Sequence, residues 1–393
     1  MFSDIASLFQ SPTNPLYRER DALLAEGKEI IDLVSGNVNR HGLLYPQTAL
    51  ERALREGADR AKVYRPDPLG QSAARQAISD YYQEEGISIP ADRILITPGT
   101  SLSYWYAFKL LADPDDEILS PRPTYPLFDS IAALSGVRLV HYRLRALDRW
   151  VIDLDHLESL ITGRTKAIIL ISPHNPTGAV AAEKEIERLG EIAARHHLPI
   201  ISDEVFSPFL FLRERLPRPV STAAPLVLTL NGFSKMLALP GMKIGWIALS
   251  GEAASVEKAR GALETISDTF LPVNEPAQFA APILLQEGKA FLNEYRAEIG
   301  RRRETALRAL SGSASLSFIP PEGGFYLTVR INDPEADEEK IALDLLRRFG
   351  LLVHPGYFFD LEPAHFTFSF VSEPAALEQS LKKIVAYFNG HSG

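Results

Sequence analysis

Seven short apolar runs rich in β-branched residues recur along the chain, and they constrain its fold more than any other feature. Their hydrophobicity is continuous rather than alternating, which is typical of strands buried on both faces of a sheet. Amphipathic helical patterns lie between several of them, clearest at 183–197. The sequence therefore predicts an α/β fold in which helices cover both faces of a mostly parallel, seven-stranded sheet. The seven runs are Ile94–Thr97, Glu117–Leu119, Arg138–His141, Ala167–Ser172, Pro199–Ser202, Val227–Leu230 and Ile244–Leu249.

The pattern changes beyond the last of these runs. The pattern of residues 275–310 predicts one long helix. Pro282 and Gly288 are the points at which we expect a bend or an interruption. A helix at 339–349, a strand in HFTFSFV and a closing helix follow, which together indicate an α+β lobe. We expect a large domain over 45–285, and a small domain built from 1–44 and 286–393.

Composition excludes several classes of function. The 393 residues carry a net charge of −9 and no basic run, which argues against nucleic acid as a partner. The absence of cysteine excludes disulfides and thiolate metal sites, and the histidines show no metal-ligand spacing. The N-terminal stretch lacks the features of a signal peptide, and no apolar run is long enough to span a membrane. A cytoplasmic protein without a membrane partner is expected.

Polar residues follow five of the predicted strands. The carboxyl ends of parallel strands share one edge of the sheet, where ligands bind in such folds. Gly99 precedes Thr100 and Ser101, whose amides would open a helix and suit a phosphate. The other loops carry Tyr125 in PRPTYP, Asn175 in SPHNPTG, Asp203 in SDEVF, and Ser234 with Lys235 in an apolar, glycine-rich stretch.

Each loop taken alone has an ordinary structural explanation, such as a rigid turn for Asn175 or a helix cap for Asp203. Together they offer amide donors for an anion, an aromatic plane, an amide side chain, a carboxylate and a lysine. A lysine in apolar surroundings titrates low and becomes a nucleophile toward carbonyls. Pyridoxal phosphate requires this set of groups.

Over nearly its whole length the chain resembles the fold-type I pyridoxal-phosphate enzymes, specifically the class I/II aminotransferases. The resemblance rests on Tyr64 and Gly70 in VYRPDPLG, and on PGTS, PTYP, HNPTG, SDEV and SKMLALPGMKIG. It implies that Lys235 is the Schiff-base lysine and proton carrier, and that Asp203 partners the pyridinium nitrogen.

The resemblance assigns further roles. Asn175 would bind the ring hydroxyl and Tyr125 would stack on the ring. Thr100 and Ser101, preceded by Gly99, would bind the phosphate, and we count Ser234 with these cofactor-binding residues. Tyr64 would reach the phosphate of a neighbouring subunit, which implies a homodimer with shared sites. Gly36 matches the loop that closes over the substrate's carboxylate, and PEGGFY at 321–326 matches a loop of the small domain.

Three positions depart from the family pattern. Phe206 stands where a tyrosine usually bonds the ring oxygen, and Lys243 replaces the arginine that grips the phosphate as a bidentate fork. Thr367 occupies the place of the arginine that holds the substrate's α-carboxylate, and no arginine occurs after Arg348. Arg40, in the loop that begins at Gly36, is the first candidate to replace it, and Arg122 is the second.

Three functions follow from this pattern. The first is transfer of an amino group between an amino acid, or a related amine, and a 2-oxo acid. The second is a lyase, decarboxylase or biosynthetic cyclase of the same fold, which the missing clamp at Thr367 favours. The third is a non-catalytic sensor domain, which would need a fused DNA-binding segment that this sequence does not contain. The first is preferred.

Overall fold

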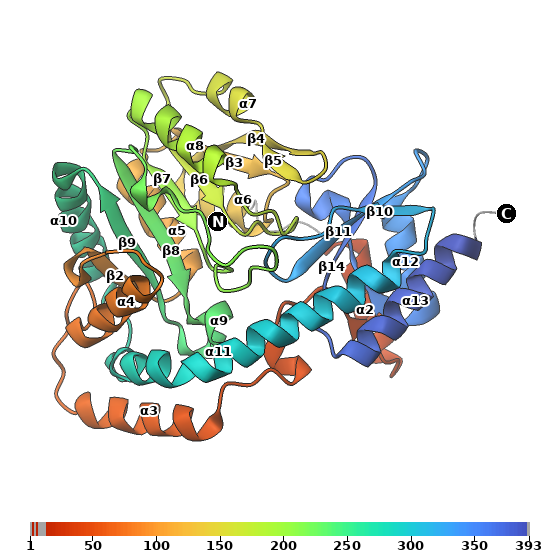
Figure 1. Ribbon diagram of the computed structural model, residues 1–393, viewed down its shortest axis with the longest axis horizontal. Coiled ribbons are helices and arrows are strands. Elements are labelled where there is room, and N and C mark those ends of the chain that lie inside the picture. Colours follow the sequence, from red (N-terminus) through yellow and green to blue (C-terminus); the bar gives the residue numbers. More distant parts are fainter. Residues whose placement is uncertain (1, 4, 7–12, 391–393) are drawn as a thin grey trace.

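The computed structural model describes residues 2–3, 5–6 and 13–390 of the chain. Its larger part is built on a sheet of eight strands in the order β2-β9-β8-β7-β6-β3-β4-β5 (Figure 1). All seven predicted runs form strands of this sheet, so the predicted class is confirmed. They are β2 (Ile94–Thr97), β3 (Glu117–Arg122), β4 (Arg138–Ala146), β6 (Thr165–Ile171), β7 (Ile200–Asp203), β8 (Leu226–Gly232) and β9 (Gly245–Gly251).

The eighth strand corrects the predicted count. β5 (Trp150–Ile152) pairs antiparallel with β4 through Ala146 and Trp150, and closes a hairpin at the sheet's edge. Three residues are too few to show a periodic pattern, so this strand could not be predicted from the sequence.

The strand directions bring the functional loops together. β3, β4, β6, β7 and β8 are parallel neighbours. β9 runs antiparallel to both β8 and β2, so β2 points the same way as β8. The carboxyl ends of β2, β3, β6, β7 and β8 therefore lie along one edge.

Helices cover both faces of the sheet. On one face, α5 (Thr100–Leu111), α6 (Leu127–Ser135) and α10 (Ala253–Phe270) bury aromatic and aliphatic side chains against it. On the other, α8 (Glu183–Arg195) packs Leu189 and Ile192 onto the strands, beside α7 (Leu154–Ser159). The helix predicted at 183–197 is thus confirmed, and ends at Arg195.

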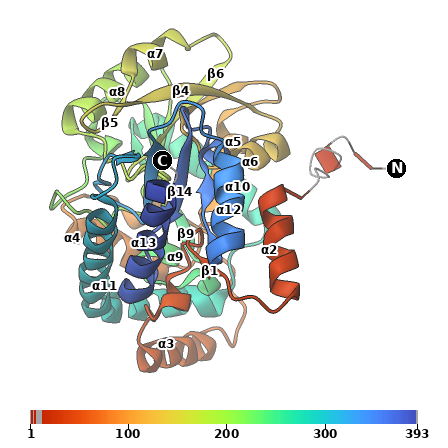
Figure 2. The ribbon, with the colours of Figure 1, turned by 90° about the vertical axis from the view of Figure 1, so that its right-hand side faces the viewer.

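The smaller part contains an antiparallel sheet, β10-β11-β14-β13. It combines β10 (Leu316–Phe318), β11 (Tyr326–Ile331), β13 (His354–Pro355) and β14 (His365–Ser369) with α12 (Glu338–Phe349) and α13 (Pro374–Gly390). The N-terminal region joins it, because α2 (Pro15–Ala25) contacts α12 and β1 (Ile31–Asp32) pairs with β12 (Leu351–Leu352). Figure 2 shows α2, α12, α13 and α11 along this side of the molecule.

One helix links the two parts. α11 (Glu275–Leu310) continues without a break through Pro282 and Gly288, so the interruption that these residues suggested does not occur. Its 36 residues span about 54 Å. It contacts α3 (Gln47–Arg60) and α4 (Ser72–Glu84) as well as α13 (Figure 1). The predicted domain boundary at 285 falls inside α11, and the division at that residue stays a prediction.

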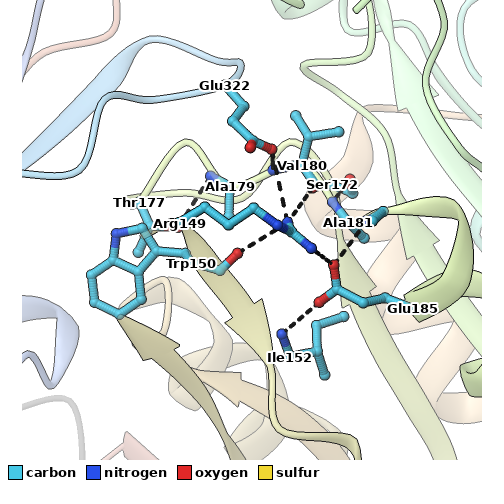
Figure 3. Close-up of polar contacts among 11 residues, drawn as sticks. Arg149, Trp150, Ile152, Ser172, Thr177, Ala179, Val180, Ala181, Glu185 and Glu322 are labelled. Carbon is cyan, nitrogen blue, oxygen red and sulfur yellow. Dashed lines mark hydrogen bonds and ion pairs between the residues drawn. The ribbon is translucent and has the colours of Figure 1, made fainter. Parts of the chain in front are cut away.

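Arg149, in the turn between β4 and β5, organises a polar network beside the sheet (Figure 3). Its guanidinium donates to the carbonyls of Trp150 and Val180, at 3.3 and 3.2 Å, and pairs with Glu185. The carboxylate of Glu322, from the segment before β11, accepts the N–H of Val180 at 3.2 Å. These contacts connect the loop after β6 with three other regions, namely β5, α8 and the smaller part of the chain.

Within residues 2–3, 5–6 and 13–390, no helix is both long and apolar enough to cross a membrane. No cluster of His, Asp or Glu side chains in these ranges is arranged to hold a metal ion.

Gly178 lies at a close contact between the two parts, and we expect Gly178→Ala to destabilise the fold. Its carbonyl accepts the N–H groups of Glu322 and Gly323, both at 2.9 Å. Its φ is +68°, and an added Cβ would lie 2.3 Å from the Cβ of Pro321. Strain and overlap together should lower the free energy of unfolding by roughly 2–4 kcal/mol, measured by urea denaturation.

Gly163→Ala is the matched control, because a Cβ at that position meets no atom within 4 Å. An equal loss of stability in both variants would show that the joint at Gly178 is not closely packed.

Candidate active site

An inner cavity of about 220 Å³ opens at the edge where the five strand ends meet. Residues from all five predicted loops line it, so the structure brings together side chains that are far apart in the sequence. The predicted residues in its wall are Thr100, Ser101, Tyr125, Asn175, Asp203, Ser234 and Lys235.

Lys235 lies in the short helix α9 (Phe233–Met236), directly after β8, and its side chain is half-buried. Its Nζ is 3.4 Å from the carbonyl oxygen of Gly36, and 5.8 and 5.9 Å from the ring centres of Phe206 and Phe325. It forms no ion pair with any described residue. Loss of hydration lowers the pKa of Lys235 to about 8, which leaves a usable fraction of neutral amine near neutral pH.

Asp203 is the last residue of β7 and is buried in the wall of this cavity. One carboxylate oxygen accepts the hydroxyl of Tyr104 at 2.8 Å, and the other accepts the N–H of Val205 at 3.0 Å. Burial raises the pKa of Asp203 to about 6. These two hydrogen bonds fix the orientation of the carboxylate, and no described cation forms an ion pair with it.

Tyr104 is a site residue that the sequence analysis missed. It lies one helical turn after Thr100 and Ser101 on α5, so it faces the same cavity. Its distance of one helical turn from the predicted phosphate-binding residues is the sequence signal that could have identified it. Trp105 and Tyr106, which follow it, do not line the cavity.

The start of α5 lies at one end of the cavity. Gly99 takes a φ of +112°, which a residue with a side chain rarely adopts. Leu102 and Ser103 donate the first helical hydrogen bonds to the Gly99 carbonyl. The N–H groups of Thr100 and Ser101 come before these bonds and have no helical acceptor, which suits them to bind an anion.

Three further side chains form other parts of the cavity wall. Tyr125 packs edge-on against Phe128, with ring centres 5.8 Å apart. The side-chain oxygen of Asn175 is buried and has no hydrogen-bond partner among the described residues, which points to a ligand. Phe206, 3% exposed, packs edge-on against Phe325 at 5.0 Å and presents no polar group to the cavity.

Tyr326, the first residue of β11, also escaped the sequence analysis. Its motif, PEGGFY, was recognised without a role for the tyrosine. A Cβ added to Gly36 would lie 2.5 Å from the Tyr326 hydroxyl, so this position leaves no room for a larger residue. Burial raises the pKa of Tyr326, which keeps its hydroxyl neutral. Tyr326 lines both the inner cavity and a larger, outer cavity.

An outer cavity of about 440 Å³ adjoins the first and shares Tyr125, Leu127, Asn175 and Tyr326 with it. Thr367 of β14 lines this outer space, and pairs in the sheet with His354 of β13. The His354 ring bonds the Tyr17 hydroxyl at 2.7 Å. Among the residues that the structure describes, no lysine or arginine lines the outer cavity.

Besides the glycines Gly36 and Gly99, four predicted residues line neither cavity. Arg40 is exposed in the turn Val38–His41, because Asn39 points inward instead and donates to the Ala238 carbonyl at 2.9 Å. Lys243 is exposed in a left-handed turn, with a φ of +53°. Arg122 pairs with Asp360 at 3.5 Å. Tyr64, 67% exposed, lies in the loop between α3 and α4.

We expect Lys235→Met to stabilise the cofactor-free protein. Because burial lowers the pKa of Lys235 to about 8 from 10.5, the folded state bears a poorly hydrated charge at pH 7. The penalty is complete below pH 8 and is lost as the pH rises to 10.5, since the folded state releases its proton first. The free energy of unfolding should rise by about 1–3 kcal/mol at pH 7, a figure reduced for the side chain's partial exposure, and by less at pH 10.

Urea unfolding at the two pH values measures this difference. Lys243→Met, at an exposed lysine of the same segment, is the control and should change stability little. Equal effects of both variants, or no pH dependence, would contradict a desolvated ammonium at Lys235.

Known proteins resemble this chain in sequence and in structure. A family model described as aminotransferase class I and II matches residues 28–384. The glutamate-pyruvate aminotransferase AlaA of Escherichia coli is 30% identical over 96% of this chain and 95% of its own length. A probable aspartate/prephenate aminotransferase of Aquifex aeolicus is 30% identical over 97% of both chains.

The structure of an alanine aminotransferase from Pyrococcus furiosus superposes with a TM-score of 0.92 at 27% identity, covering 99% of this chain and 100% of the other. Because the family model covers most of the chain and these relatives match it nearly end to end, the chain belongs to the class I and II aminotransferases, which are pyridoxal-phosphate-dependent enzymes.

Proposed function

We propose that Lys235 carries pyridoxal phosphate in the inner cavity, and that the enzyme transfers an amino group from an amino acid or related amine to a 2-oxo acid. The observation that carries the proposal is the position of Lys235. Its unpaired, half-buried amine shares one small cavity with the Asp203 carboxylate and the first amides of α5.

The residues present fit the cofactor. The wall of the inner cavity combines a lysine with a lowered pKa, a buried carboxylate, free helix amides and an aromatic side chain. The unpartnered oxygen of Asn175 adds a polar group that a bound ring substituent would satisfy. When bound, pyridoxal phosphate supplies an aldehyde for the amino group and a ring that withdraws electrons from the carbon bearing it.

The chain's own residues divide the remaining work. Thr100 and Ser101 bind the phosphate through their N–H groups. Asp203 would accept a hydrogen bond from the ring nitrogen and keep it protonated, and Tyr104 fixes the orientation of that carboxylate. Tyr125 would stack on the ring from the cavity wall. Lys235 would take a proton from the substrate's amino-bearing carbon at its Nζ and give it to the carbon that takes over the amino group, so that the amine ends in the form in which it began; a pKa near 8 is suitable for this exchange.

Other parts of the proposal concern assembly and location. Tyr64 lines neither cavity of its own chain and is 67% exposed, which supports a role at the phosphate of a second subunit in a homodimer. We retain Lys243 as the cation near that phosphate and a cytoplasmic location as predictions from the sequence. Arg40 receives no support as a carboxylate ligand, since its side chain is exposed away from both cavities.

We expect the holoenzyme to be yellow, and to retain the cofactor through denaturation after borohydride reduction. Lys235→Ala should abolish this covalent retention, because no other lysine lines the inner cavity among the described residues. Peptide mass spectrometry after reduction locates the label. Lys243→Ala is the control and should keep the label on Lys235. Labelling of Lys235→Ala at another lysine would refute the assignment.

A donor screen tests the reaction class. The holoenzyme is incubated with a set of amino acids and amines, together with pyruvate or 2-oxoglutarate. A transaminase produces the amino acid that corresponds to the acceptor, without release of ammonia or CO₂. Ammonia or CO₂ as the main product would instead support the lyase or decarboxylase reading that Thr367 suggests.

We expect Phe206→Tyr to lower the pH midpoint of the holoenzyme's absorbance titration. Phe206 lines the inner cavity with no polar atom, and the variant's hydroxyl would donate to the ring oxygen of the cofactor in its ionised form. A hydrogen bond to a charged group of about 1.5–3 kcal/mol corresponds to a midpoint lower by about 1–2 pH units. Phe128→Tyr, in the same wall, is the control. An unchanged or higher midpoint in Phe206→Tyr would show that residue 206 does not reach the ring oxygen.

A further inference from the structure

The outer cavity is aromatic and without a cation. Its walls contain the rings of six phenylalanine and tyrosine residues, and none of the described residues in them is lysine or arginine. Its volume of about 440 Å³ lies within the range of small-molecule sites. The six residues are Tyr17, Tyr125, Tyr326, Phe358, Phe359 and Phe368.

Thr367 does not replace the missing arginine by offering its hydroxyl. The residue is 2% exposed, and its Oγ1 is buried without a hydrogen-bond partner among the described residues. Thr367 offers at most one neutral hydroxyl, which cannot balance the charge of a carboxylate as an arginine would. A carboxylate in this space would therefore meet no cation among the described lining residues.

The neighbouring polar groups do not supply positive charge either. Burial lowers the pKa of His354 to about 4, so the ring that bonds Tyr17 is neutral at pH 7. Burial raises the pKa values of Tyr17 and Tyr326, and the nearby Asp32 carboxylate adds to this rise. Asp32, which accepts the N–H groups of Val34 and Ser35, therefore brings negative rather than positive charge to the neighbourhood of the cavity.

Two arginines lie near the cavity without forming its wall, and both are already paired. Arg20 lies over the Tyr17 ring at 4.7 Å and bonds Asp21 at 2.7 Å. Arg122 pairs with Asp360 at 3.5 Å, beside Phe359 of the wall. Neither guanidinium faces the cavity as a free carboxylate ligand.

We propose that the outer cavity selects a substrate whose amino-bearing carbon carries an uncharged aromatic group and no carboxylate, that is, an arylalkyl amine and its carbonyl counterpart. The inference rests on the transamination proposed above and narrows its donor. An anion placed among these rings loses hydration without gaining a partner, whereas a phenyl group gains contact. Because burying an unpaired charge is costly, such a site should favour the uncharged compound of two that differ only in that charge.

The reaction balances without a further reagent. The amine R–CH₂–NH₂ becomes the aldehyde R–CHO, while the carbonyl group of the acceptor becomes an amine. The acceptor occupies the same cavity in the second half-reaction, so an aldehyde should be preferred over the 2-oxo acid with the same substituent. A 2-oxo acid remains an acceptor at higher concentration, because the preference is one of degree.

The first experiment compares 2-phenylethylamine with L-phenylalanine, which differ only in the carboxylate. The pyridoxal-phosphate-loaded enzyme is mixed with each donor, and the half-reaction is followed by absorbance. We expect kcat/KM to be about ten- to hundredfold higher for the amine, the range associated with one missing charged hydrogen bond. Calorimetric titration with 2-phenylethanol and 3-phenyllactate, which cannot donate an amino group, should show the same order of affinity.

The second experiment restores the cation. Thr367→Arg should raise kcat/KM for phenylalanine relative to 2-phenylethylamine by about tenfold or more. Ser317→Arg adds the same charge at an exposed position of β10, in the same sheet, and should leave the ratio unchanged. If Thr367→Arg does not fold, the wild-type comparison and the calorimetry decide the question.

The outcomes separate the two proposals. Equal or higher kcat/KM for phenylalanine in the wild type, with tight binding of 3-phenyllactate, overturns the present inference and leaves transamination standing. Ammonia or CO₂ as the product, or no reaction with donors of either class, overturns transamination and this inference with it. A preference for 2-phenylethylamine that Thr367→Arg reverses supports both.

Discussion

An ammonium group held in a cavity without a carboxylate partner is the constraint on which the rest of the site depends. Lys235 has a backbone carbonyl and two aromatic rings around its Nζ. Asp203, the only carboxylate among the described residues of the inner cavity, is bound by Tyr104 and Val205 instead. Keeping the two charges apart costs stability, and a fold with an extensive core can tolerate that cost. The separation leaves both groups available to a ligand that lies between them.

Much of this arrangement could be predicted from the sequence, because the signals are local. Continuous apolar runs such as β7 and β8 identify strands buried on both faces, and parallel strands place the residues that follow them at one edge. Asp203 and Lys235 each come within a few residues of a strand's carboxyl end, so their meeting follows from topology alone.

The remaining features depend on contacts between distant segments, which a single sequence does not encode in any short pattern. Tyr17 and His354 meet across 337 positions, and Lys235 meets Gly36 across 199. Proximity to a motif does not fix side-chain direction: Arg40 lies close to Gly36 in the chain, yet in that turn Asn39 points inward and Arg40 is exposed. Side-chain direction in a short turn is decided by packing, and β5 was too brief to show any period.

The joint at Gly178 limits how the two parts of the chain can move relative to one another. The loop that carries Asn175 and the segment that leads into Tyr326 are joined by two backbone hydrogen bonds at one carbonyl, and the Glu322 carboxylate adds a third contact. These segments bear residues of both cavities, so a rotation of the smaller lobe carries them together. Because β13 lies in the same sheet as β11, His354 and Tyr326 would move as one unit, and α2 would move with them through its contact with α12. The joint at Gly178 is then the point about which the smaller part would turn, so Asn175 and Tyr326 would stay close together while parts of the two lobes farther from the joint separate.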